Sequence, residues 1–177
     1  MSRRIASSES KVVFQAERDI RARLEHHELD FTAMSAVSNI YRAGSAVRNH
    51  MERSLLAGYD LSWVAFTVLW VLWIWGEQET GHVAAEAGVT KGTLTGVMKT
   101  LQARKLIKRI PHRDDRRRVS IGLSKAGERL IEEVFPEFNQ RETLAVSALS
   151  VSEQNELARL LRLVLTRINT VTDEETA

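Results

Sequence analysis

The apolar residues of this 177-residue chain recur mainly at intervals of three and four, which is the spacing of amphipathic helices. Residues 1–8 are polar, and we expect them to be disordered. Segments 9–28 and 32–56 each carry an apolar stripe among polar and charged positions. A further stripe over 157–171 follows a capping box formed by Ser150 and Glu153. The pattern therefore predicts amphipathic helices at both ends of the chain.

The segment 63–75 differs from these because it is apolar on every face, with the sequence WVAFTVLWVLWIW. Ser62 precedes it and is a suitable N-cap. At thirteen residues the run is too short to cross a bilayer, which needs about 20 residues. A helix that is apolar all round is expected to be buried on all sides, so we predict a central core helix.

Residues 80–124 combine two helical periods with two alternating ones. The helical stretches cover about 80–87 and 90–105, with Thr80 and Thr90 as expected N-caps and Gly88-Val89 as the turn. Apolar alternation over about 106–123 brackets a loop of sequence HRDDRRR. Helix, turn, helix and β-hairpin together make a winged helix-turn-helix. Ser124 then caps another helix, which Pro136 is expected to bend.

These elements predict a mainly α-helical fold with one small β-hairpin wing. We expect a winged helix-turn-helix lobe over 61–125. Residues 9–60 and 126–177 are expected to supply dimerisation helices, because a core of this size cannot cover their apolar stripes and a second copy can. The chain would then be a homodimer.

Positive charge is concentrated on the winged-helix segment. Residues 88–127 hold eleven basic and two acidic residues, a net charge of +9, whereas the whole chain is +2. A basic surface on a helix-turn-helix is typical of a double-stranded DNA-binding protein. A solvated hairpin loop is the alternative explanation of the arginine run.

Composition excludes several other classes of protein. The chain has no cysteine, so disulfides, thiol nucleophiles and cysteine zinc sites are ruled out. His26 and His27 are adjacent on a helix and would point about 100° apart, so we expect no metal site there. The sequence has no glycine-rich phosphate-binding loop and no Ser, His and acidic residues spaced as in a known catalytic motif. We therefore predict neither an enzyme nor a cofactor. No apolar run follows the first residues, so we expect a cytoplasmic protein.

Two blocks of sequence resemble the MarR (multiple antibiotic resistance regulator) family. In DDRRRVSIGLSKAGERL, Asp115 and Arg117 match the family's D-x-R pair, and Leu123, Ser124 and Gly127 match its L-T-x-x-G with Ser for Thr. The stretch HVAAEAGVTKGTLTGVMKTLQARKLIKR is similar to the family's helix-turn-helix, with Lys105 where Gly is common. The strict motifs cover about 80–124, and the helix order agrees from 32 to 171.

The resemblance implies a winged-helix regulator that places its second motif helix in the major groove of an operator. On that helix, the side chains expected to reach DNA are Thr90, Lys91, Gly92, Thr93, Thr95 and Lys99. In the wing, Arg117 would enter the minor groove and Asp115 would orient it. The remaining wing arginines, Arg113, Arg116 and Arg118, would bind phosphates.

The family often holds a small aromatic or phenolic ligand in a crevice beside the DNA-binding lobe, and ligand binding loosens DNA. The side chains that would line such a crevice here are Trp63, Phe66 and Trp70, with His50 available for an acidic group. The alternatives are that the aromatic residues fill the core and that His50 is a surface residue.

We therefore predict a sequence-specific regulator, a repressor released by a small ligand. The alternatives within DNA binding are a ligand-independent activator and an architectural protein. A winged helix that binds a protein or RNA is a further alternative, and the concentrated basic charge argues against the protein-binding form.

Overall fold

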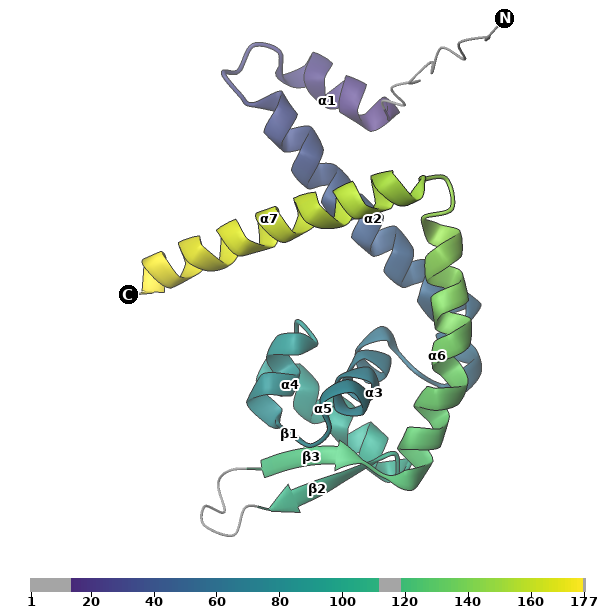
Figure 1. Cartoon of the computed structure of the whole chain (residues 1–177). Coiled ribbons are helices and arrows are strands. Elements are labelled where there is room, and N and C mark those ends of the chain that lie inside the picture. The colour runs from purple at the N-terminus through teal and green to yellow at the C-terminus, as the bar shows by residue number, and fades with distance from the viewer. Residues whose placement is uncertain (1–13, 112–118, 177) are drawn as a thin grey trace, which may run out of the picture. The chain divides into compact units, whose positions relative to one another are not determined.

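The computed structural model describes residues 14–111 and 119–176 of the chain (Figure 1). The chain divides into two compact units between Ala46 and Val47. The expected boundary near residue 60 therefore differs from the observed one. The difference arises because Met51, Leu55 and Leu56 are buried in the core of the second unit.

The first unit holds α1 (Gln15–Leu24) and the start of α2 (Phe31–Ser54). Asp30 caps α2, since its carboxylate accepts from the amides of Thr32 and Ala33 at 3.0 and 2.9 Å. A side-chain hydrogen bond of 3.0 Å from Asn39 to Glu17 joins the two helices. None of residues 14–46 is buried. The helix predicted over 9–28 ends at Leu24 in the structure, four residues earlier than expected. Residues 9–13 lie outside the described part, as do residues 1–8, which we expected to be disordered.

The second unit is built around α3 (Trp63–Trp75), which begins and ends where the sequence predicts. Ser62 caps it by accepting from the amide of Ala65 at 3.2 Å. Before it, α2 ends at Ser54 and a short 3-10 helix, η1 (Leu56–Tyr59), leads into the cap. The predicted second helix, 32–56, thus ends two residues too late and begins one residue too late.

The prediction that α3 is buried on all sides is wrong at the C-terminal end of the helix. Phe66, Val68, Leu69 and neighbouring residues are buried, but Ile74 and Trp75 at its C-terminal end are 49% and 46% exposed. The last turn of the helix extends past the residues that cover its middle. The edge of Trp75 packs against Trp70, with ring centroids 5.3 Å apart.

The helix-turn-helix consists of α4 (Thr80–Glu86) and α5 (Lys91–Ala103). Gly88 takes a φ of +62° at the turn, a conformation that favours glycine. Thr90 caps α5 by accepting from the amide of Thr93 at 3.2 Å. Thr80 does not cap α4, contrary to expectation. Glu79 precedes it in extended conformation because it belongs to a strand, so Thr80 is the first helical residue.

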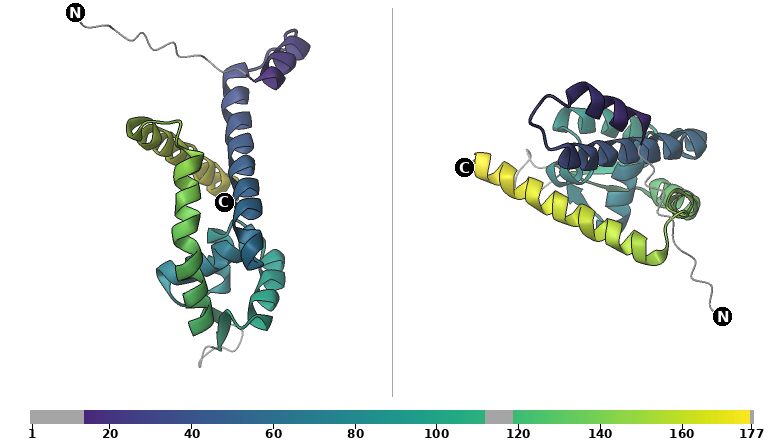
Figure 2. Two further views of the ribbon diagram at one scale, coloured as in Figure 1. Left: turned by 90° about the vertical axis from the view of Figure 1, so that its right-hand side faces the viewer. Right: turned by 90° about the horizontal axis from the view of Figure 1, so that it is seen from above.

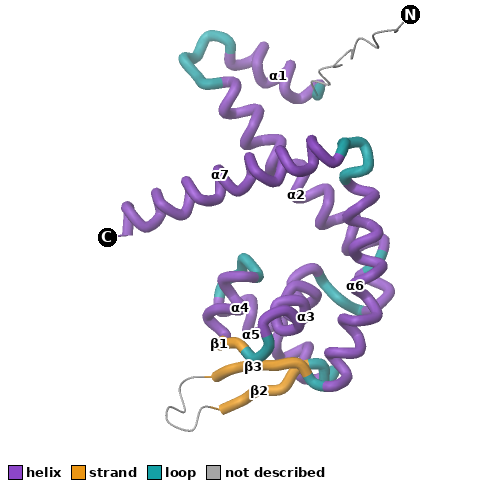
Figure 3. The backbone as a smooth tube through the Cα atoms, in the orientation of Figure 1, coloured by secondary structure: helices purple, strands orange, loops and turns teal. Residues whose placement is uncertain are grey.

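The wing belongs to a three-stranded antiparallel sheet in the order β1-β3-β2 (Figure 3). Strand β2 (Ile107–Pro111) pairs with β3 (Val119–Leu123), with Ile107 opposite Leu123 and Arg109 opposite Ile121. The short strand β1 (Gln78–Glu79) adds to the other edge of β3. Two of the strands confirm the predicted hairpin. The third was not predicted, because a two-residue polar strand carries no apolar alternation.

Helix α6 (Lys125–Ala145) follows the sheet and packs against α3 (Figure 2). Ser124 caps it, accepting from the amides of Ala126 and Gly127 at 3.2 and 3.1 Å. At Gly127 the helix passes so close to the sheet that an added Cβ would overlap the carbonyl oxygen of Leu106. The helix continues through Pro136. The fold is therefore mainly helical with a small sheet, as predicted.

Helix α7 (Val151–Thr176) begins at the predicted capping box, where Ser150 and Glu153 bond reciprocally. Hydrogen bonds from the Ser150 hydroxyl and amide lower the pKa of Glu153 below its ordinary value. None of residues 151–171 is buried, although the helix carries apolar side chains along its length.

Candidate functional site

The outward face of α5 carries the predicted recognition residues. The exposed residues are Lys91, Gly92, Thr93, Thr95 and Lys99, whereas Leu94, Met98 and Leu101 are buried beneath them. The structure thus brings these predicted residues to one surface, next to the cap residue Thr90. No acidic residue occurs in the sequence from Ala87 to Arg113, so this surface is uniformly neutral or positive.

Hydrogen bonds within α5 decide what its threonines can offer a partner. The Thr95 hydroxyl donates to the carbonyl oxygen of Lys91 at 2.8 Å, so its free lone pair can accept from a donor. The hydroxyls of Thr90 and Thr93 lie 3.0 Å apart and share a hydrogen bond. Thr95 is therefore suited to a base amino group, and each threonine methyl is suited to thymine.

A hollow of about 330 Å³ lies beside this face, and we call it the basic hollow. Its lining comes from α4, α5 and β2, namely Thr80, Lys91, Leu94, Thr95, Met98, Lys99, Gln102 and Arg109. Three of these side chains are cations and none is an acid. A concave surface with several cations is a suitable seat for a phosphate group.

The sequence interpretation did not include Thr80, Gln102 or Arg109 in this site. The alternation of side chains along a strand could have identified Arg109 as a residue of this site. It stands opposite Ile121 in the ladder, and residues directly opposite share one face of a sheet. Ile121 is fully buried, so Arg109 lies on the helix-facing side.

Its neighbour Lys108 lies on the other face of the sheet and has a carboxylate partner. The Lys108 ammonium is 3.2 Å from Glu77. Adjacent strand residues point to opposite faces of the sheet, so Arg109 and Lys108 carry the same charge on different faces. Lys108 is therefore a suitable control position for Arg109.

The predicted wing residues cannot be placed. Arg113, Asp115, Arg116, Arg117 and Arg118 all lie outside the described residues. The strands on either side of them in the sequence, β2 and β3, pair with each other, and β2 carries Arg109.

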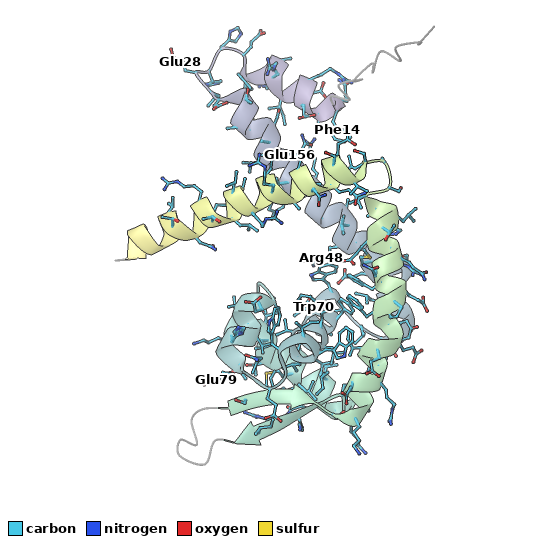
Figure 4. All side chains as sticks on the ribbon, viewed as in Figure 1. Phe14, Glu28, Arg48, Trp70, Glu79 and Glu156 are labelled. Atoms are coloured by element: carbon cyan, nitrogen blue, oxygen red, sulfur yellow. The ribbon has the colours of Figure 1, made fainter. Side chains whose placement is uncertain are left out.

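A second hollow, of about 380 Å³, lies between α3 and α6, and we call it the aromatic hollow. Its lining is Trp63, Phe66, Thr67, Trp70, Phe135, Phe138 and Glu142. The structure therefore brings together Trp63, Phe66 and Trp70, three of the four residues that we proposed as ligand-binding from the sequence. Figure 4 shows Trp70 on α3, on the side of the lobe away from the strands.

The other predicted ligand residue, His50, does not line the aromatic hollow. The lining residues that the sequence did not predict are Thr67 on α3 and three residues of α6. Phe135, Phe138 and Glu142 are spaced by three and four and so share one helix face. Stacking of Phe138 on Phe66, with centroids 4.2 Å apart, joins this face to α3.

Other chemistries find no site in the described part of the chain. Among residues 14–111 and 119–176, no three His, Asp or Glu side chains gather as metal ligands. None of the described helices combines the length and apolar character that a membrane crossing requires.

Comparison with known proteins agrees with the fold. The sequence model described as MarR family matches residues 61–119. The chain is 36% identical over 142 residues to the Bacillus subtilis protein named as the uncharacterized HTH-type transcriptional regulator YwaE, covering 80% of this chain and 83% of that one.

Two solved structures extend the likeness beyond the motif. BpsR of Bordetella bronchiseptica superposes with a TM-score of 0.69 at 25% identity, covering 73% of this chain and 98% of BpsR. A mutant MarR from E. coli, solved with operator DNA, gives a TM-score of 0.69 at 20% identity over 76% of this chain and 96% of that one. The latter supports the fold alone. Together with the sequence relatives, these findings show that the chain belongs to the MarR family of DNA-binding transcriptional regulators.

Proposed function

We propose that the chain works as a homodimeric repressor that binds a roughly palindromic operator and is released by a small ligand. The observation that carries the proposal is the outward face of α5 with the basic hollow beside it, where three cations meet and no acid lies. A regulator must reach its DNA, so we also propose a cytoplasmic location.

In this proposal, α5 enters the major groove. Thr93 and Thr95 contact base edges, and Thr90, Lys91, Gly92 and Lys99 approach the backbone and groove wall. Arg109 and Lys99 bind a phosphate from opposite sides of the basic hollow. The wing arginines add the minor-groove contacts implied by the family motif. The E. coli protein, whose fold is similar, was solved with operator DNA.

Helix α7 supports the homodimer. Its apolar side chains remain accessible in the single chain, with Leu160 46% and Leu165 59% exposed. A long helix gains most of its stability in water from packing, so α7 requires a partner surface. A second copy offers the same stripe, and a two-fold dimer places two recognition helices on successive major grooves.

The aromatic hollow supports the proposal that a small ligand regulates the protein. It is of the size and apolar character expected of a small-molecule site, and it lies in the same unit as α5. BpsR is described as a protein whose DNA binding is regulated by 6-hydroxynicotinic acid. A ligand that favours one arrangement of α3 and α6 would shift the dimer away from its DNA-binding form.

The test is binding of the purified protein to a labelled duplex from its own upstream DNA across a salt series, with a scrambled duplex as competitor. We expect selective binding, two subunits per site and a steep loss of affinity with salt. Equal binding to both duplexes would contradict sequence-specific regulation. Reporter expression with and without the gene then separates repression from activation.

A further inference from the structure

The described lining of the aromatic hollow carries a negative charge, that of Glu142. We propose that this hollow selects a small organic cation with an apolar or aromatic body, and that it disfavours aromatic acids. The inference rests on the proposed function only in assigning this hollow to the regulatory ligand.

The first step is the aromatic wall. Trp63, Phe66 and Trp70 from α3 face Phe135 and Phe138 from α6. Phe138 stacks on Phe66 and lies 5.9 Å from Trp63, centroid to centroid, so these three rings are in contact across the two helices. Aromatic ring faces carry negative electrostatic potential and attract a cation within about 6 Å.

The second step concerns charge. Among the described residues that line the hollow, the carboxylate of Glu142 is the one charged group. Asn139 donates to one of its oxygens at 3.0 Å and leaves the other oxygen available. Glu142 also lines a neighbouring hollow of about 400 Å³ beside α7, so the carboxylate stands where the two hollows meet. A ligand whose charged end reaches Glu142 can place its apolar body against the rings.

The third step concerns the neutral polar groups. The Thr67 hydroxyl already donates to the carbonyl oxygen of Trp63 at 2.9 Å, so it offers a ligand only lone pairs. The indole N–H groups of Trp63 and Trp70 are donors without formal charge. No lysine, arginine or histidine lines this hollow among the described residues.

The arginine next to Glu142 in sequence is held elsewhere. The Arg141 guanidinium donates to the hydroxyl and the carbonyl oxygen of Ser54 at 3.1 and 3.0 Å, and it also lies 3.6 Å from the Glu137 carboxylate. It therefore does not neutralise Glu142. A second acid, Glu52, accepts from the amide of Trp63 at 2.8 Å and adds negative charge at the N-terminal end of α3.

The energetic consequence is a preference set by charge. An organic cation gains attraction from both the carboxylate and the ring faces, whereas a carboxylate or phenolate meets repulsion from Glu142. Glu142 is exposed, so solvent screens the effect. We expect a cation to bind about three- to tenfold more tightly than a neutral molecule of equal shape.

The experiment uses three probes on the full-length protein: phenyltrimethylammonium, its uncharged isostere tert-butylbenzene, and benzoate. Binding is measured by ligand-observed NMR at constant ionic strength, with sodium chloride as the balancing salt. The expected order of affinity is phenyltrimethylammonium, then tert-butylbenzene, then benzoate.

Two variants connect this order to the hollow. Glu142→Gln is expected to bring the affinity for phenyltrimethylammonium to within about twofold of that for tert-butylbenzene, because it removes the charge and keeps the shape. Glu133→Gln is the matched control. It removes an exposed carboxylate of the same helix that does not line the hollow, and it should leave all three affinities unchanged. Trp70→Leu should weaken both the cation and the isostere.

Benzoate binding as tightly as phenyltrimethylammonium would overturn the inference. So would cation affinity that Glu142→Gln leaves unchanged, or the absence of binding by all three probes. Operator binding by the same preparation is measured in parallel. Loss of selective operator binding would contradict the proposed function, whereas intact operator binding with a preference for the anion would contradict only this inference.

Discussion

The second unit carries two hollows of similar volume and opposite character. The basic hollow measures about 330 Å³ and the aromatic hollow about 380 Å³. Three cations and no acid line the first, whereas five aromatic rings and one carboxylate line the second. Size therefore does not distinguish a nucleic-acid surface from a small-molecule site in this protein. The charge and aromatic content of the lining do.

The two hollows are also assembled differently. The basic hollow needs a strand, since Arg109 on β2 faces residues of α5. The aromatic hollow needs only the packing of α6 on α3. The sheet and α6 meet where Gly127 passes Leu106, so this contact supports both hollows at once.

Gly127→Ala should therefore have the largest effect, because it removes both sites together. The new methyl group would overlap the Leu106 carbonyl oxygen and force the sheet and α6 apart. We expect a loss of about 3 kcal/mol or more in the free energy of unfolding, measured by denaturant titration. Gly81→Ala is the control, since no neighbouring atom lies within 4 Å of its added Cβ and helical Ala is favoured over Gly. Equal stability of the two variants would show that the contact at Gly127 is not tight.

The double variant Lys99→Ala with Arg109→Ala removes two of the three cations that line the basic hollow and leaves the aromatic hollow unchanged. Operator affinity is expected to fall by about 100-fold at physiological salt, and the salt dependence should become shallower by about one for each phosphate that is no longer neutralised. Affinity is measured by fluorescence anisotropy. Lys108→Ala removes an equal charge from the opposite face of the same strand, and it should change affinity by less than about threefold. An equal loss in this control would mean that net charge, and not the hollow, determines binding.

Thr93→Ala should have a smaller and more selective effect. Its hydroxyl is exposed on α5, and its loss is expected to change discrimination at one base pair by about 1–3 kcal/mol. Selection from a randomised operator library measures this change. A uniform loss of affinity across all sequences would assign Thr93 to backbone contact or to the cap it shares with Thr90.

Ser124→Ala should have the smallest effect and should act on stability alone. Ser124 caps α6 and donates to the carbonyl oxygen of Lys105 at 2.6 Å. Losing these bonds should cost about 1 kcal/mol in the free energy of unfolding. Probe and operator affinities should be unchanged below the unfolding transition. A specific loss of operator affinity would indicate that the cap also sets the position of the wing.

The sequence by itself determined the elements that depend on close neighbours. The caps at Ser62, Thr90 and Ser124 were all predicted correctly, because a cap needs only a hydroxyl and an amide two or three residues away. The exposed face of α5 followed from helical periodicity, and the charge excess marked it as a surface for DNA.

Only the tertiary structure decided what distant segments build together. The strand β1 exists because Gln78 and Glu79 meet β3 more than 40 residues later, and it moves the start of α4 so that Thr80 is not its cap. Arg109 lines the basic hollow together with Lys99, and Glu142 lines the aromatic hollow together with Trp70. Local periodicity assigns each of these residues to a face of its own strand or helix. Strand pairing and helix packing decide which distant face it meets.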